Sequence, residues 1–109
     1  MDGNAATGVQ VRDNPKLHRF EVDLGGDTYA VAEYNLLSGK IMFTHTEVPN
    51  AFEGRGIGTA LIQAGLNAAR ERGLQVIPAC HFFASYIQRH SEVQDLLDTS
   101  YRSVLGLDR

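Results

Sequence analysis

The sequence has little of three features that would point to particular protein classes: cysteine, clustered positive charge and long hydrophobic runs. Its single cysteine, Cys80, cannot form an intramolecular disulfide or a cysteine-based zinc site, so we expect a fold without crosslinks and without a metal. No apolar run approaches the roughly 18 residues that span a bilayer, which argues against a membrane protein. The ten lysine and arginine residues are scattered and the net charge is -3, which argues against general nucleic-acid binding, because that activity needs many neutralised phosphates.

The length of 109 residues indicates one domain with a single modest core. The N-terminal stretch MDGNAATGVQ is small and polar, and it lacks the basic start and the apolar segment of a secretory signal. We therefore predict a flexible tail over residues 1–8, one domain over residues 9–109 and a cytoplasmic location.

Turn-forming residues divide the first half of the chain into short segments with the alternation or β-branched and aromatic content of strands. The predicted strands are Val9–Arg12, His18–Leu24, Thr28–Leu36 and Lys40–Val48. The predicted turns between them are Asp13-Asn14-Pro15, Gly25-Gly26-Asp27 and Ser38-Gly39. Pro49 cannot donate to a ladder, so the last of these strands is expected to end beside it. Consecutive hairpins predict an antiparallel meander.

From Gly56 the hydrophobic pattern changes to helical spacing. The predicted buried stripe consists of Ile57, Ala60, Leu61, Ala64 and Ala68. Gly73 suits the position just after a helix, and Leu74–Cys80 is predicted as a short buried strand. A strand, a helix and a second strand form a crossover unit, which predicts that the two strands are parallel neighbours.

The C-terminal residues 85–101 have helical spacing at Tyr86, Ile87 and His90. Ser91 is predicted to cap a second short turn that contains Val93, Leu96 and Leu97. Together the segments predict an α+β fold, with an antiparallel meander, one long central helix, one further strand and a short helical C-terminal segment.

The stretch VPNAFEGRGIGTALIQ, residues 48–63, places three glycines directly before the predicted helix. Unpaired N–H groups and the positive end of the dipole attract phosphate to a helix N-terminus. Gly54, Gly56 and Gly58 lack the Cβ atoms that would hold a diphosphate away, and Arg55 adds a positive charge. A simple turn is the alternative interpretation. The loop lacks the Lys-Ser/Thr ending of a P-loop, and it follows a hairpin strand rather than opening a dinucleotide-binding unit.

This loop resembles the acetyl-CoA loop of the GCN5-related N-acetyltransferases, whose form is Arg/Gln-x-x-Gly-x-Gly/Ala. The segment EGRGIG, residues 53–58, matches both glycines and departs at Glu53, where the family has Arg or Gln. A carboxylate repels a diphosphate, so Glu53 must point away or pair with a cation such as Arg55. Together with HTEVP (residues 45–49) and VIPAC (residues 76–80), the loop is similar to the small YjdJ-type branch of the family over about residues 16–98.

The resemblance implies the GCN5-related fold, in which the fourth and fifth strands splay apart and the pantetheine of acetyl-CoA lies in the wedge. It implies that the backbone of Val48 contacts the acetyl and pantetheine end. It also implies that the loop residues hold the diphosphate through their main chain; these are Gly54, Arg55, Gly56, Ile57, Gly58 and Thr59.

Acetyl transfer needs a neutral amine, a polarised carbonyl and a proton for the leaving thiolate. His45 and Glu47 are two residues apart on a predicted strand and therefore share a face, with Thr46 pointing the other way. His45 is our candidate base, because histidine titrates near neutral pH. Glu47 is the alternative base, acting directly or through water. The structural alternatives are that His45 is a hydrogen-bonding residue of the strand and that Glu47 is a solvated carboxylate.

Cys80 and Tyr86 complete the candidate catalytic set. Cys80 ends the strand expected to flank the thioester, where it could take the acetyl group or act as a base; a buried packing role is the alternative. The resemblance implies that a tyrosine after the fifth strand protonates the thiolate, and Tyr86 is the candidate. Arg89 is a candidate phosphate contact.

We therefore predict an acetyl-CoA-dependent N-acetyltransferase that acts on an amine of a small molecule, a peptide or a lysine, without nucleic-acid or membrane partners. One alternative is a non-catalytic module that binds acetyl-CoA or CoA. A second alternative is an interaction domain without a cofactor.

Overall fold

The computed structural model describes residues 8–107, and all of the predicted tail except Gly8 lies outside these residues. The elements in chain order, with η for a 3-10 helix, are β1 (Arg12–Asn14), η2 (Pro15–Leu17), β2 (Arg19–Gly25), β3 (Thr28–Leu37), β4 (Lys40–Glu47), η3 (Asn50–Phe52), α1 (Ile57–Glu71), β5 (Gln75–Pro78), α2 (His81–Arg89), η4 (Ser91–Leu96) and α3 (Thr99–Val104).

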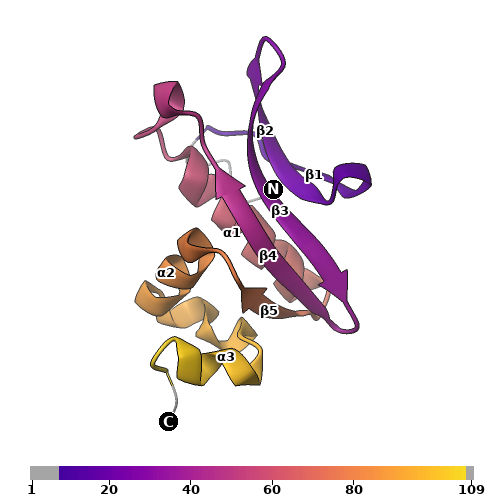
Figure 1. The fold of residues 1–109 in the computed structure, drawn as a ribbon, viewed down its shortest axis with the longest axis vertical. Coiled ribbons are helices and arrows are strands. Elements are labelled where there is room, and N and C mark those ends of the chain that lie inside the picture. Colours follow the sequence, from indigo (N-terminus) through magenta and orange to yellow (C-terminus); the bar gives the residue numbers. More distant parts are fainter. Residues whose placement is uncertain (1–7, 108–109) are drawn as a thin grey trace.

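One five-stranded sheet, with its strands in sequence order, organises these elements (Figure 1). Strands β1 to β4 pair antiparallel, and β5 pairs parallel to β4 after the crossover through α1. Gly25, Gly26 and Asp27 all have positive φ, so the predicted hairpin turn uses the left-handed region that glycine adopts without strain. The predicted meander, crossover and α+β class are confirmed.

The first strand is not where the sequence predicts it. Strand β1 covers Arg12–Asn14 instead of Val9–Arg12, so Asp13 and Asn14 of the predicted turn lie in the strand and only Pro15 follows it. Contacts with a carboxylate on β2 account for this position. Glu21 is only 1% exposed, and it accepts hydrogen bonds from Arg12 Nε at 2.6 Å, Arg19 Nε at 2.8 Å and Asn14 Nδ2 at 3.2 Å. Burial raises the pKa of Glu21, but these hydrogen bonds outweigh it and hold the pKa below the usual value.

The C-terminal segment also differs from the prediction. Helix α2 begins at His81, before the predicted helical segment, and Ser91 is the first residue of η4 instead of its cap. Helix α3 was not predicted. Asp98 caps it by accepting from the Ser100 amide, and its carboxylate lies 2.7 Å from Lys40 Nζ on β4. The cap and the ion pair fix this segment beside the sheet.

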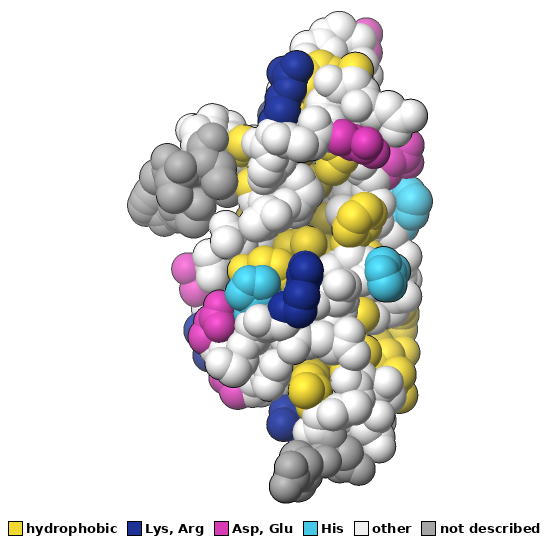
Figure 2. All heavy atoms as spheres, turned by 90° about the vertical axis from the view of Figure 1, so that its left-hand side faces the viewer, with side chains coloured by type: hydrophobic (Ala, Val, Ile, Leu, Met, Phe, Trp, Pro, Cys, Tyr) yellow, Lys and Arg dark blue, Asp and Glu magenta, His cyan; other side chains and the backbone are white. Residues whose placement is uncertain are grey.

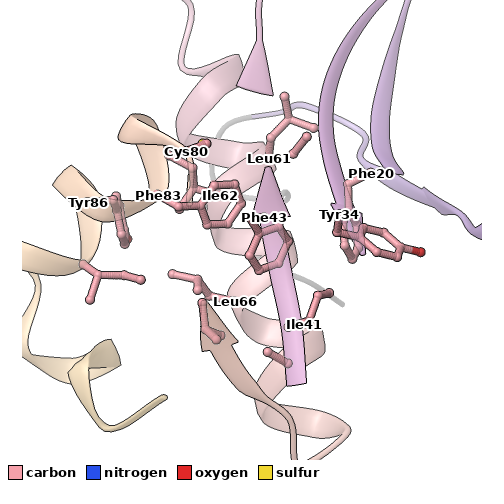
Figure 3. Close-up of a cluster of buried hydrophobic side chains, with 14 of the residues drawn as sticks. Phe20, Tyr34, Ile41, Phe43, Leu61, Ile62, Leu66, Cys80, Phe83 and Tyr86 are labelled. Carbon is pink, nitrogen blue, oxygen red and sulfur yellow. The ribbon is translucent and has the colours of Figure 1, made fainter. Parts of the chain in front are cut away.

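Helix α1 packs on one face of the sheet, and its buried surface is wider than the predicted stripe. Ala64 and Ala68 are only partly buried, and residues outside the predicted stripe are buried in a helix that contacts both the sheet and α2. The buried residues of α1 are Ile57, Ala60, Leu61, Ile62, Gly65, Leu66 and Ala69. Phe43 of β4 and Phe83 of α2 stack with ring centroids 3.9 Å apart and an interplanar angle of 7° (Figure 3). This stack joins the two elements that border the site described below.

Candidate functional site

A pocket of about 650 Å³ lies between the end of β4, the glycine loop, the first turns of α1 and one side of α2. Figure 2 views the molecule from the side on which the glycine loop and α2 lie, and hydrophobic side chains gather along this side with charged and histidine side chains around them. The lining residues are Thr46, Glu47, Val48, Phe52, Glu53, Gly54, Gly56, Ile57, Gly58, Thr59, Ile62, His81, Phe82, Ser85, Tyr86 and Arg89.

The pocket opens because β4 and β5 separate. Their ladder ends at the pair Phe43 and Pro78, and the Cys80 amide then donates to the Phe43 carbonyl at 3.0 Å. Beyond that bond β4 continues to Glu47, whereas the segment that follows β5 turns into α2. The predicted splay of the fourth and fifth strands is therefore present, with its vertex at Phe43 and Cys80.

A β-bulge lies at the same level of β4. Glu33 of β3 pairs with His45 and the next residue, Tyr34, pairs with Phe43, so Thr44 is an extra residue in the strand. Strict alternation from the buried Phe43 would bury His45, but the bulge leaves Thr44 and His45 exposed and buries Thr46. The bulge thus decides which side chains of β4 face the pocket.

The glycine loop leads into helix α1 with two of its glycines in the left-handed region. Gly54 and Gly56 have φ of +83° and +78°, a left-handed backbone that side chains rarely adopt. Gly56 is the N-cap of α1, and no side chain caps this helix end. A Cβ at Gly58 would lie 3.7 Å from Val48 Cγ2, and both residues line the pocket. Backbone N–H groups at the positive end of the helix dipole therefore lie at the pocket.

The two charged residues of this loop do not pair with each other in any interaction found within residues 8–107. Glu53 is exposed and lines the pocket, and its amide donates to the Asn50 carbonyl at 3.2 Å. The Arg55 guanidinium lies over the Phe52 ring, 5.2 Å from its centroid. The carboxylate that departs from the family pattern is thus part of the pocket wall.

His45 and Glu47 share a face of β4, as predicted, and His45 Nε2 lies 3.1 Å from Glu47 Oε1. Both side chains are exposed, 54% for His45 and 67% for Glu47. Glu47 lines the pocket and His45 lies behind it as its hydrogen-bonding partner. The pair can accept and pass on a proton at the pocket edge.

Cys80 is buried at the vertex, with 8% exposure, and its Sγ lies 3.1 Å from Thr46 Oγ1. Thr46 lines the pocket, and Cys80 contacts it from behind. Figure 3 shows Cys80, Phe83 and Tyr86 on the same side of the core. The structure therefore brings Cys80 to the wedge, one side chain away from the pocket surface.

Tyr86 lines the pocket from α2 and is 8% exposed. Its hydroxyl accepts from Gln63 Nε2 of α1 at 3.4 Å. The ring stacks on His90 with centroids 3.8 Å apart, and His90 Nδ1 lies 2.7 Å from the Tyr86 carbonyl oxygen. These contacts with Gln63 and His90 hold the tyrosine ring in the pocket wall.

Several lining residues were not predicted for the site. Helix α2 contributes His81, Phe82 and Ser85 beside Tyr86 and Arg89, which was named as a phosphate contact. Phe82 is 53% exposed, which is unusual for a phenylalanine and indicates a binding surface. Sequence spacing alone does not show this exposure. Thr46 was assigned only to the opposite face from His45, and its position at the vertex follows from the bulge.

Residues 8–107 contain no group of three or more His, Cys, Asp or Glu side chains arranged to hold a metal ion. In the same range, every helix is too short or too polar to cross a membrane.

Comparisons with known proteins agree with the family resemblance. A model of the family described as GCN5-related N-acetyl-transferase matches residues 19–96. The chain is 33% identical to Protein NATD1 of Gallus gallus over 84 residues, which cover 75% of this chain and 76% of that protein. It is 31% identical to Protein NATD1 of Xenopus tropicalis over 87 residues, covering 78% and 80%. A GCN5-like protein from Staphylococcus aureus, solved by NMR, has a similar fold, with a TM-score of 0.67 and 23% identity over 83% of this chain and 88% of that one.

Proposed function

The chain belongs to the GCN5-related N-acetyl-transferase family, and we propose that it transfers an acetyl group from acetyl-CoA to an amine. The observation that carries this proposal is the pocket between α2 and the part of β4 that no longer pairs with β5, with an uncapped helix N-terminus in the pocket wall. An extended thioester with a diphosphate at one end matches that combination of an apolar wedge and a cluster of backbone donors.

In this proposal the diphosphate lies against the main chain from Gly54 to Thr59. The support is steric: positive φ at Gly54 and Gly56 and the absence of a Cβ at Gly58 leave the backbone accessible. Val48, which lines the pocket where β4 has left its ladder, is proposed to contact pantetheine through its backbone. Arg55 and Arg89 are proposed as additional positive charges near the phosphates.

His45 is proposed as the base, with Glu47 orienting it and stabilising its protonated form. The amine nitrogen attacks the thioester carbon, a C–N bond forms and the C–S bond breaks. The amine proton passes to His45 and the CoA thiolate leaves, taking a proton from Tyr86. The support for these roles is the 3.1 Å contact between His45 and Glu47 at the pocket edge and the position of Tyr86 in the opposite wall.

A covalent route through Cys80 is a second proposal for the same reaction. The Cys80 thiolate would attack the thioester carbon and release CoA, and the amine would then displace the thiol. Its support is the position of Cys80 at the vertex, in contact with the pocket residue Thr46. Incubation with acetyl-CoA and no amine should then add one acetyl mass that Cys80→Ala abolishes, whereas the direct route predicts an unchanged mass.

The acceptor is proposed to be an amine on a flexible or exposed group, such as a lysine side chain. The side of β4 that carries His45 and Glu47 is exposed, so an acceptor reaches them without a lid opening. A non-catalytic module that binds acetyl-CoA is the alternative, since the wedge would serve binding without these two residues.

The proposal is tested by calorimetric titration with acetyl-CoA, followed by measurement of free CoA thiol with a panel of amines. We expect saturable binding, and CoA release that requires an amine and falls strongly in His45→Gln. Binding without turnover on every amine would favour the non-catalytic module. Absence of binding, with no increase in melting temperature, would favour an interaction domain without a cofactor.

A further inference from the structure

Thr46 is one of the most buried residues that line the pocket. Among the lining residues only four are more than nine-tenths buried: Thr46, Ile57, Ile62 and Tyr86, at 7%, 6%, 5% and 8% exposure. Two of these, Ile57 and Ile62, are purely apolar. Thr46 and Tyr86 are therefore the two most buried lining residues that carry a hydroxyl.

The Thr46 hydroxyl has a weak hydrogen-bonding partner. Its Oγ1 lies 3.1 Å from Cys80 Sγ, and this is the contact found for the Thr46 side chain within residues 8–107. The backbone of Cys80 is itself held in place, because the Cys80 amide donates to the Phe43 carbonyl at 3.0 Å. A thiol is a weak donor and a weak acceptor, so a buried hydroxyl that has only this partner keeps unused hydrogen-bonding capacity.

The two polar atoms can share their protons in a way that leaves one donor free. If the Cys80 thiol donates to Thr46 Oγ1, the hydroxyl proton of Thr46 is available to a third group. Because Thr46 lines the pocket, a molecule bound there can be this third group. A donor that is fixed in advance and removed from water stabilises developing negative charge better than water does.

We propose that Thr46 is a catalytic residue that donates a hydrogen bond to the carbonyl oxygen of the thioester. This inference rests on the proposed function. When the amine nitrogen bonds to the carbonyl carbon, the carbonyl π electrons move to the oxygen, and Thr46 Oγ1–H stabilises that charge. The C=O bond re-forms as the C–S bond breaks, and Thr46 retains its own proton and bonds throughout.

The proposed role of Thr46 differs from the roles of its neighbours on β4. His45 and Glu47 face the exposed side of the strand, and the bulge at Thr44 turns Thr46 to the opposite side, toward Cys80. A proton acceptor for the amine and a proton donor for the carbonyl thus come from adjacent residues on opposite faces of one strand. The thioester carbon lies between these two groups in the proposed complex.

The test is steady-state kinetics of the full chain with acetyl-CoA and an accepted amine. Thr46→Val keeps the shape of the side chain and removes the hydroxyl, Thr46→Ser keeps the hydroxyl, and Thr44→Val repeats the first change at the exposed bulge residue. We expect kcat to fall about 100-fold in Thr46→Val, as for loss of one oxyanion donor, with the calorimetric Kd for acetyl-CoA within about threefold. Thr46→Ser should recover most of the kcat that Thr46→Val loses, and Thr44→Val should stay within about threefold of wild type in kcat.

The outcomes distinguish this proposal from others. A Thr46→Val variant with wild-type kcat would overturn it, since other donors would then suffice. Loss of activity in Cys80→Ala with retained activity in Thr46→Val would also overturn it and assign the chemistry to the thiol. A fall in kcat confined to Thr46→Val supports it, provided that the melting temperatures of the variants agree. If the wild-type protein binds no acetyl-CoA, the proposed function itself fails.

Discussion

Gly65→Ala is expected to destabilise the protein although it replaces glycine in the middle of a helix. In an open helix position this change would stabilise the fold by about 0.8–1.0 kcal/mol, because alanine has the higher helix propensity. At Gly65, however, the new Cβ would lie 2.9 Å from Phe43 Cε1 and Cζ and 3.2 Å from Phe83 Cζ. Both rings are fully buried and stacked on each other, so neither has space to move away.

The two opposing effects give a net magnitude. Overpacking in a filled core costs about 1–3 kcal/mol, and contacts of 2.9 Å with one buried ring and 3.2 Å with a second belong in the upper half of that range. After subtraction of the propensity gain, we expect a net loss of about 1–2 kcal/mol. For a domain of this size the loss corresponds to a decrease of about 4–16 °C in melting temperature.

Thermal and urea unfolding followed by circular dichroism measures this loss. Gly58→Ala in the same helix is the matched control, because its Cβ would make an ordinary 3.7 Å contact with Val48. The control should be as stable as wild type or slightly more stable. A Gly65→Ala protein with wild-type or increased stability would refute the reasoning, because the Phe43 and Phe83 rings would then have room to adjust.

Three further predictions concern the loop and the sheet. Gly58→Ala, although folded, should weaken acetyl-CoA binding at least about tenfold by calorimetry, because a Cβ occupies the approach to the helix N-terminus; unchanged affinity would place the diphosphate elsewhere. Glu53→Gln should tighten acetyl-CoA binding several-fold at low salt by removing a carboxylate from the pocket wall, and the gain should shrink at high salt; equal affinities would mean that the carboxylate points away. Burial raises the pKa of Glu21, but the hydrogen bonds from Arg19 and Arg12 lower this pKa by more. Glu21 therefore stabilises the fold above its unfolded pKa of about 4, and this stabilisation is lost as the pH falls through the lower pKa of the folded state. The stability of Glu21→Gln should therefore vary less with pH below about 5 than that of wild type, and parallel curves would contradict this account.

The meander and the central helix could be predicted because their signals are local. Apolar alternation, the Gly25-Gly26-Asp27 turn and the glycine at position 73 each act through their own backbone conformation, and the structure has each where expected. The position of β1 could not be predicted in this way. It depends on where the Glu21 carboxylate finds its partners, which is a contact between strands.

Prediction of the C-terminal segment and of the site was limited for the same reason. Helix α2 starts at His81 without a capping side chain, so no local signal marks its beginning. The glycine loop was predicted as one wall of the site, and the structure provides the opposite wall through Phe82 and Tyr86. Thr46 was missed because its burial depends on the separation of β4 from β5 and on the bulge, neither of which is encoded in spacing.

The bulge at Thr44 has a consequence for how this strand tolerates insertions and deletions. Because β3 pairs with the residues on either side of Thr44, deletion of Thr44 would close the bulge and leave the histidine and the glutamate on the water side. A slip that pairs Thr44 with Glu33 would instead exchange the two faces of the strand beyond it, so that the histidine and the glutamate would project beneath the helix and the threonine hydroxyl would move to the water side. We therefore expect β4 to tolerate the loss of this one residue better than a shift of its register.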